Sequence, residues 1–175
     1  MANLPPDAAP VLDAMRDWIH LGPYVLYNPS DSAYSGYDGS YIYWEYIWSD
    51  LTGWLDRDNG IDLYCHSVSC LLSVLVGQWG IEAPQQVLGV GFHTNLLRAA
   101  DTTTWGTWTF NSHSVVSPDD GATIWDASVA MDGDDDPSAL PTTELAPKGL
   151  TQEMYLQRLT DDPIGIVNTG LCYVY

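Results

Sequence analysis

Three residues of this 175-residue sequence have the types that nucleophilic thiol catalysis requires: Cys65, His113 and Asp126. A cysteine nucleophile needs a base to take its proton, and the base needs a third group that orients it. His113 opens a β-prone run, and Asp126 lies in the next run, beyond the turn sequence SPDDG (117–121). Because a hairpin folded about that turn brings positions 113 and 126 towards each other, we expect the imidazole and the carboxylate to pair there.

The thiol is placed by the most clearly marked element, a helix expected over residues 63–79. Asp62 is a possible N-cap, and Gly80 stands where a C′ glycine would end the helix. The apolar residues between them recur at helical spacing: Val68, Leu71, Leu72, Leu75, Val76 and Trp79. Cys65 falls in the first turn on the apolar side, where the helix dipole favours a thiolate. Cys70 falls on the predicted polar face, and we expect no catalytic role for it.

The other elements predict an α+β fold with a small antiparallel sheet, on which the cysteine helix packs. A helix over 11–20 and a short helix over 151–159 have suitable patterns, and residues 1–10 read as a loose lead-in. The β-prone runs are Gln86–Phe92, Trp105–Phe110, His113–Ser117, Thr123–Val129 and a last extended stretch, Ile164–Tyr175. The turn-rich segments 22–40 and 132–149 are predicted loops. We expect one domain over residues 1–175, with a catalytic core over 60–130.

Composition limits the partners. Five basic residues against 23 acidic ones give a net charge of −18, which disfavours nucleic acids and anionic membrane surfaces. An apolar fraction of 46% nevertheless indicates a folded chain rather than an acidic tail. The charge would attract a protein or peptide substrate that is basic or carries amines. Oligomeric state cannot be read from these features.

The cysteine count bears on compartment. Three cysteines leave at least one thiol free, and no signal peptide is visible near the start of the sequence. These features favour a reducing cytoplasm or a non-classically exported effector. A catalytic module cut from a larger secreted toxin is a further interpretation of the same features.

The segment from Cys65 through HSVSCLLSVLVGQW to Gly80-Ile81 resembles the cysteine helix of the transglutaminase-like superfamily. NSHSVV around His113 resembles the histidine strand of that superfamily, and IWDAS around Asp126 resembles its Trp-Asp motif. The resemblance covers roughly residues 60–130. It implies a papain/transglutaminase-like fold and attack by the thiol on an amide carbonyl. The resulting acyl-thioester would pass to an amine (transamidation) or to water (deamidation or peptide hydrolysis).

The oxyanion of such a reaction needs a hydrogen-bond donor, and the backbone N–H of Cys65 can supply one. Relatives often add a Trp or Gln side chain. The candidates in this sequence are Trp54, which lies nearest upstream of Cys65, together with Trp48, Trp44 and Gln78.

Two departures from the family pattern keep other functions open. Leu63 and Tyr64 precede Cys65 without the frequent glycine, and Ser-Val-Val follows His113 in place of Ala or Ser and an aromatic residue. One alternative is therefore a catalytically inactive module whose aromatic block, residues 41–54, binds a protein partner. Another is an acidic mimic that occupies a basic site on another protein.

The remaining polar residues form no second site in the sequence. His66 is a rival base for Cys65, but the helical spacing predicts that it is solvated, and we interpret His20 and His93 as structural. Asp132, Asp134 and Asp136 alternate as in a calcium loop, yet the bidentate Glu of such loops is missing. We therefore expect neither a metal nor a cofactor.

Overall fold

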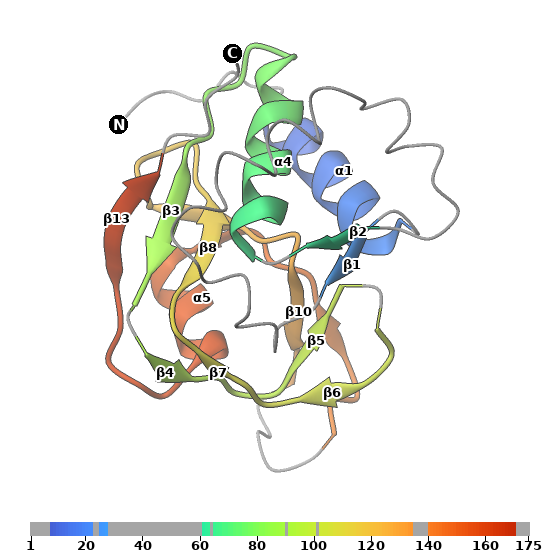
Figure 1. Ribbon diagram of the computed structural model, residues 1–175, viewed down its shortest axis with the longest axis vertical. Coiled ribbons are helices and arrows are strands. Elements are labelled where there is room, and N and C mark those ends of the chain that lie inside the picture. Colours follow the sequence, from blue (N-terminus) through green and yellow to red (C-terminus); the bar gives the residue numbers. More distant parts are fainter. Residues whose placement is uncertain are drawn as a thin grey trace.

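The computed structural model describes residues 8–22, 25–27, 61–63, 65–89, 91–100, 102–134 and 140–170. In this part of the chain, three helices accompany antiparallel sheets, so the predicted α+β class is confirmed (Figure 1). The helices are α1 (Ala8–Leu21), α4 (Cys65–Gly77) and α5 (Gln152–Leu159). The strands are β1 (Val25–Tyr27), β2 (Ile61–Leu63), β3 (Gln85–Leu88), β4 (Phe92–His93), β5 (Leu97–Ala99), β6 (Trp105–Gly106), β7 (Thr109–Phe110), β8 (His113–Val116), β9 (Thr123–Trp125), β10 (Val129–Asp132), β11 (Glu144–Leu145), β12 (Lys148–Thr151) and β13 (Ile166–Gly170).

A five-stranded antiparallel sheet carries the region that the sequence marks as catalytic. Its strands lie in the order β12-β9-β8-β3-β13. β8 and β9 form the expected hairpin, with Val116 opposite Trp125, and β3 lies on the other side of β8 with Leu88 opposite His113. All four residues of β8 are buried. α4 packs against β8, and α1 packs against α4, as the ribbon shows.

A second sheet and two strand pairs complete the described structure. The second sheet has the strand order β11-β10-β5-β6, and β4 pairs with β7 in antiparallel fashion. β1 and β2 form a parallel pair. Four strands, β1, β10, β11 and β12, correct the sequence reading, because they lie wholly or partly in the predicted loops 22–40 and 132–149. Strands as short as these leave little periodicity to detect.

The cysteine helix is shorter than predicted. Its regular hydrogen bonding starts at Cys65 and ends at Gly77. Asp62 is not its N-cap, because Asp62 lies in β2 opposite Leu26. The C-terminal signal is confirmed: Gly80 has φ +74°, its N–H donates to the Gly77 carbonyl (2.9 Å), and the Ile81 N–H donates to Val76 (3.3 Å). This pair of bonds is a Schellman motif with glycine at C′.

Two residues of α4 and its C-terminal turn correct the predicted faces. Trp79 was expected in the buried stripe, but it is 66% exposed because the chain has already left the helix there. Cys70 was expected on a polar face, but it is only 1% exposed and is disulfide-bonded. The helix has no polar face near Cys70 because its side chains are covered from more than one direction. The expectation of reduced cysteines does not hold for Cys70.

The flanking helices follow their predicted patterns closely. α1 begins at Ala8, so the end of the expected lead-in is helical, and Pro10 sits in the first turn, where its missing N–H costs nothing. α5 begins after Thr151, whose hydroxyl accepts the Met154 N–H (3.2 Å) as an N-cap. No helix among the described residues is both long and apolar enough to cross a membrane.

Candidate active site

The centre of the site is a buried ion pair between His113 and Asp126. Nε2 of His113 donates to Oδ2 of Asp126 at 2.7 Å. His113 is 0% exposed and Asp126 1% exposed, so water does not compete for either group. His113 opens β8, and Asp126 directly follows β9. The hairpin predicted around residues 117–121 therefore brings these two residues together, as the sequence suggested.

Asp126 is held by donors on both carboxylate oxygens. The Tyr155 hydroxyl, from α5, donates to the same Oδ2 that binds His113 (2.7 Å). The backbone N–H of Ser128 donates to Oδ1 (2.7 Å). A carboxylate that accepts several hydrogen bonds is stabilised in its charged form. Accordingly, although burial alone would raise it, the pKa of Asp126 is lowered by His113, Tyr155 and the Ser128 N–H.

The same contacts keep His113 protonated. Burial by itself would lower the pKa of His113, but the charge and hydrogen bond of Asp126 outweigh burial and raise the pKa to about 10. The Cys65 side chain adds to this rise, both by its charge and by a hydrogen bond. The thiol is therefore close enough to His113 to interact with the imidazole. Nδ1 of His113 has no oxygen or nitrogen partner among the described residues.

Cys65 occupies the first position of α4, at the positive end of the helix dipole. Its side chain is half-buried, and its Sγ lies 3.9 Å from the carbonyl oxygen of Ser112, the residue before His113. Gln85 of β3 ties down the start of this helix, because its Nε2 donates to the His66 carbonyl (2.9 Å) and to the Ser69 hydroxyl (2.6 Å). The thiol is thus presented by a helix end that is anchored to the sheet.

An aromatic ring covers the imidazole. Phe110 of β7 stacks on His113 with 5.0 Å between ring centroids and 8° between planes. Phe92 meets Phe110 edge to face at 5.7 Å. A stacked ring fixes the plane of the imidazole and interacts favourably with an imidazolium. Sequence reasoning did not single out Phe110.

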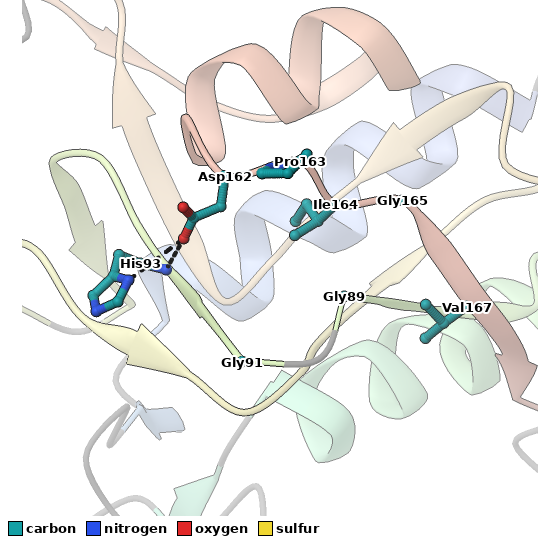
Figure 2. Close-up of a pocket in the computed structure, with 8 residues that line it drawn as sticks. All are labelled: Gly89, Gly91, His93, Asp162, Pro163, Ile164, Gly165 and Val167. Atoms are coloured by element: carbon teal, nitrogen blue, oxygen red, sulfur yellow. Dashed lines mark hydrogen bonds and ion pairs between the residues drawn. The ribbon is translucent and has the colours of Figure 1, made fainter.

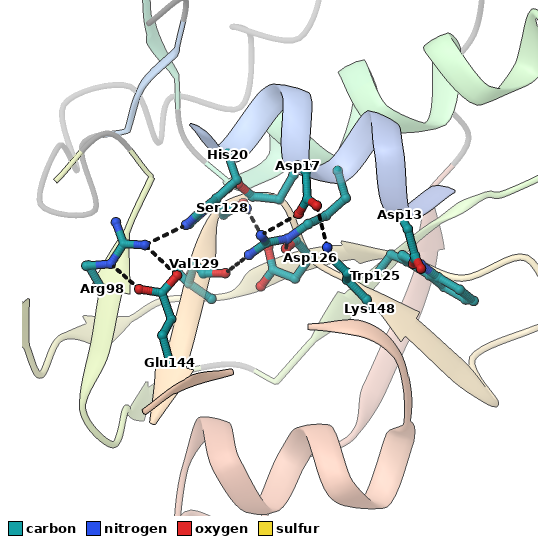
Figure 3. A network of polar contacts seen from close by, with 12 residues as sticks. Asp13, Asp17, His20, Arg98, Trp125, Asp126, Ser128, Val129, Glu144 and Lys148 are labelled. Carbon is teal, nitrogen blue, oxygen red and sulfur yellow. Dashed lines mark hydrogen bonds and ion pairs between the residues drawn. The ribbon is translucent and has the colours of Figure 1, made fainter. Parts of the chain in front are cut away.

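The segment after Asp126 is held from the side of α1. Arg16 is 1% exposed; its Nε donates to the Asp126 carbonyl (2.8 Å) and its Nη2 to the Val129 carbonyl (2.7 Å), while Asp17 pairs with Nη1 (3.2 Å). Asp17 also pairs with Lys148 of β12 (Figure 3). The fixed fork of a guanidinium can bridge two carbonyls in this way. Arg16 is a positioning residue, because it acts on the backbone that carries the Asp126 carboxylate.

His20 continues this network without a charge. Its Nδ1 lies 3.1 Å from the Ala127 carbonyl, and its Nε2 lies 3.4 Å from a guanidinium nitrogen of Arg98 (Figure 3). Arg98 in turn makes a two-pronged pair with Glu144 (2.8 and 2.6 Å). Burial and the nearby Arg16 cation lower the pKa of His20 to about 4. His20 is therefore neutral, with its proton on Nδ1, because the arginine can only donate to Nε2.

The remaining predicted residues lie elsewhere or have different surroundings. Gln78 is exposed in the turn at the opposite end of α4 from Cys65, so it cannot donate to an oxyanion at the thiol. Trp44, Trp48 and Trp54, with the whole block 41–54, lie outside the described residues. His66 is half-buried rather than solvated, and burial lowers its pKa.

His93 is the other histidine whose surroundings differ from expectation. It is 80% exposed and pairs with Asp162 at the edge of a separate pocket (Figure 2). The earlier interpretation of His93 as a structural residue has no buried contact to support it.

No metal-binding cluster of three or more histidine, cysteine, aspartate or glutamate side chains is present in the described part of the chain. Asp132 and Asp134 use their carboxylates in local hydrogen bonds to backbone N–H groups of Asp134 and Thr142, at 2.9 and 2.8 Å. Asp136, the third acid of the calcium-like pattern, lies outside the described residues.

Arg16 and Tyr155 are the main site residues that the sequence reading missed, yet each had a detectable signal. Arg16 stands between Leu12 and Ile19 at the spacing of the buried face of α1, in a chain with only five basic residues. Tyr155 and Leu159 share the buried face of α5. A tyrosine on a buried face needs a partner for its hydroxyl.

Comparison with known proteins gives no independent assignment. No protein-family model, curated protein sequence or solved structure matches this chain. The geometry of the site is therefore the basis for inferring a function.

Proposed function

We propose that this chain is a cysteine-nucleophile enzyme of papain/transglutaminase-like fold that attacks amide carbonyls. Cys65 is the nucleophile, His113 the base and Asp126 the residue that orients the base. One observation carries the proposal: the buried His113 imidazole uses Nε2 for Asp126 and keeps Nδ1 without a nitrogen or oxygen partner, beside a thiol at a helix N-terminus. An oriented imidazole with a free nitrogen next to a thiol is the arrangement that thiol activation needs.

In the resting site the proton of the Cys65 thiol is already on Nδ1 of His113, so the pair is a thiolate and an imidazolium. The thiolate sulfur attacks the carbonyl carbon of the amide, and the carbonyl π electrons move to the oxygen. When this tetrahedral adduct collapses, its C–N bond breaks and the His113 imidazolium gives its proton to the leaving nitrogen. Water or a primary amine then attacks the thioester, His113 takes a proton from that nucleophile, and the C–S bond breaks to release Cys65.

Several features support this sequence of steps. α4 begins at Cys65, and the first N–H groups of a helix have no acceptor within the helix, so they can donate to the developing oxyanion. The raised pKa of His113 keeps an acid available for the leaving nitrogen. The α+β architecture, with a cysteine helix packed on an antiparallel sheet, agrees with what the motif resemblance implies.

The test is the rate at which iodoacetamide alkylates Cys65 as a function of pH, with the modified residue identified by peptide mass spectrometry. We expect rapid alkylation below pH 7 in the wild type and none at this position in Cys65→Ala. His113→Ala should slow the reaction at pH 6 by about 100-fold, the size typical of a lost base. His93→Ala is the matched control, since it removes a histidine that also pairs with an aspartate, and it should change the rate by less than about twofold.

If Cys65 instead reacts as an ordinary thiol, with a midpoint near pH 8.5, or is inert in the folded protein, the enzyme proposal fails. A non-catalytic module or an acidic mimic would then be the better interpretation. If Cys65 and His113 form a reactive pair, assays with a glutamine-containing peptide distinguish the three possible reactions. Incorporation of a fluorescent alkylamine reports transamidation, ammonia release without incorporation reports deamidation, and new termini report peptide hydrolysis.

A further inference from the structure

A pocket of about 520 Å³ lies between the loop that follows β3 and the segment that leads into β13 (Figure 2). Gly89, Gly91 and His93 line it from the first segment, and residues 162–165 and 167 line it from the second. Its size is in the range of pockets that hold small molecules or single side chains. The mechanism above makes no use of it.

Glycines keep this pocket open. Gly91 and Gly165 line the pocket, and a Cβ added to either would meet no heavy atom within 4 Å, so both have open space beside their backbones. At Gly89, by contrast, a Cβ would lie 2.9 Å from Phe92 and 3.1 Å from Ile164, and the residue has φ +54°. Gly89 therefore lets the two segments approach, and the other two glycines leave room between them.

The pocket lies at the same end of the five-stranded sheet as the candidate active site. His113, Leu88 and Ile166 are neighbours across three adjacent strands, so the pocket and the imidazole lie at the same end of the sheet. The Gly91 N–H donates to the Asn111 carbonyl (2.8 Å). The next residue, Ser112, is the one whose carbonyl contacts Cys65 Sγ. A hydrogen bond to Asn111 and one peptide bond therefore connect Gly91 of the pocket wall to the residue that touches the thiol.

The lining combines a carboxylate with aliphatic walls. Oδ2 of Asp162 accepts the His93 backbone N–H (2.7 Å), whereas Oδ1 accepts no hydrogen bond from the described residues, and Asp162 is 43% exposed. Ile164 and Val167 line the wall towards β13, and Val167 is 56% exposed at a register shift of that strand. A free carboxylate oxygen beside aliphatic surface suits a side chain with an apolar stem and a cationic end.

We propose that this pocket binds a lysine or arginine side chain of the peptide substrate, with its stem on Ile164 and Val167 and its cation at Asp162. The proposal rests on the proposed function, because the peptide whose side chain fills the pocket is the substrate that the Cys65 thiol attacks. The net charge of −18 agrees with it, since the field of the whole chain concentrates cations around the molecule.

The experiment uses alanine peptides with a chloroacetyl group at the N-terminus and one lysine at each of four successive positions. Matched peptides carry norleucine in place of lysine, which keeps the stem and removes the charge. We expect one position at which the lysine peptide alkylates Cys65 about fivefold faster than its norleucine counterpart, the scale of one partly exposed ion pair. Asp162→Asn should abolish this preference.

Two variants separate the pocket from the general field. Asp161→Asn removes the same charge one residue away, from an exposed position that does not line the pocket, and should leave the preference intact. Gly165→Leu should slow the lysine and norleucine peptides together, because it fills the pocket. An equal loss of preference in Asp161→Asn and Asp162→Asn would overturn the proposal in favour of a non-specific field.

A second readout does not depend on thiol reactivity. Peptides without the chloroacetyl group, titrated into Cys65→Ala, should shift the amide NMR resonances of Gly91 and Gly165 in the lysine series, and Asp162→Asn should remove the shifts. If these resonances do not move and no lysine position is preferred, the pocket proposal is wrong. Rapid, His113-dependent alkylation by iodoacetamide in that same case would leave the proposed function standing.

Discussion

Two histidine–aspartate pairs lie within the described residues, and they differ in distance, in exposure to solvent and in their further contacts. His113 and Asp126 are joined at 2.7 Å, and both are shielded from solvent. His93 and Asp162 are 3.4 Å apart at the closest ring nitrogen, and both reach into water. Only the buried pair has further partners that fix both groups, namely Tyr155, the Ser128 N–H and the Phe110 ring.

The difference shows which surroundings make a histidine–aspartate pair suitable for catalysis. At the exposed pair, solvent screens the attraction, and the imidazole of His93 can turn away while Asp162 keeps its hydrogen bond to the His93 backbone N–H. At the buried pair, low solvent access strengthens the interaction, and the neighbours prevent the imidazole and the carboxylate from separating. Burial, second contacts and a thiol within reach occur together only at His113.

The largest expected contrast is in stability. Asp126→Ala leaves the buried His113 Nε2–H, Tyr155 hydroxyl and Ser128 N–H without their acceptor, and should lower the free energy of unfolding by about 4 kcal/mol. Asp162→Ala should lower it by less than about 1 kcal/mol, because that pair is screened. Urea denaturation of both variants at pH 7 measures the contrast. Similar losses in the two variants would show that burial does not distinguish the pairs.

His20 sharpens the comparison, because it is buried without a carboxylate partner and its pKa is lowered to about 4. As the pH falls below about 6.5, the pKa of histidine in the unfolded chain, the unfolded state binds a proton at His20 whereas the folded state does not. Stability should therefore fall by about 3 kcal/mol between pH 6.5 and pH 4. His20→Asn keeps a donor for the Ala127 carbonyl and should flatten the stability curve in this window. An unchanged curve in the variant would assign the acid sensitivity to other groups.

His113 has the opposite linkage. Its folded pKa is raised to about 10, so its contribution is complete below pH 6.5 and is lost as the pH rises towards 10. The ring resonances of His113 in NMR spectra should accordingly stay unchanged from pH 5 to pH 8. In Asp126→Asn, which removes the main charge that raises this pKa, the His113 resonances should titrate at a lower pH than in the wild type. A His113 that titrates near pH 6.5 in the wild type would remove the basis for a stable imidazolium.

Tyr155→Phe removes the hydrogen bond from the Tyr155 hydroxyl to the Asp126 carboxylate, and its expected effect on stability is smaller. Loss of one hydrogen bond to Asp126 should cost about 1 to 2 kcal/mol of unfolding free energy. If Tyr155 also positions the carboxylate, alkylation of Cys65 at pH 6 should slow by a few fold without a change in the identity of the reactive thiol. The matched exposed change, His93→Gln, should alter stability by less than about 0.5 kcal/mol. Equal small effects in both variants would mean that Tyr155 adds nothing to the pair.

Much of the framework around the site could be predicted from local sequence signals. The hairpin turn at 117–121 predicted the approach of His113 and Asp126, since a hairpin aligns its two strands. The glycine at position 80 marked the end of the cysteine helix, because glycine readily adopts the positive φ that a C′ residue has there. The helix α5 lies within its predicted bounds, 151–159. Each of these signals depends on a few neighbouring residues, which is why one sequence is sufficient to detect them.

The rest depends on contacts that local patterns do not contain. Cys70 was assigned to a polar face because an amphipathic helix was assumed to have one covered side, whereas α4 packs against both β8 and α1. Arg16 reaches a carbonyl 110 positions away, and no periodicity reports a contact at that separation. Trp79 follows the helical spacing of the apolar stripe, but spacing does not show that the helix stops at Gly77.

The contact of Arg16 has a consequence for the order of events during synthesis. α1 is synthesised more than a hundred residues before the carbonyls of Asp126 and Val129 that accept from the Arg16 guanidinium. Until then Arg16 can pair with Asp17 of the same helix, but the two carbonyls that it bridges when buried are missing. Contacts between such distant segments form slowly. The guanidinium contacts of α1 can therefore be completed only after residue 129 has been made, and the Asp126 loop gains its support from Arg16 only then.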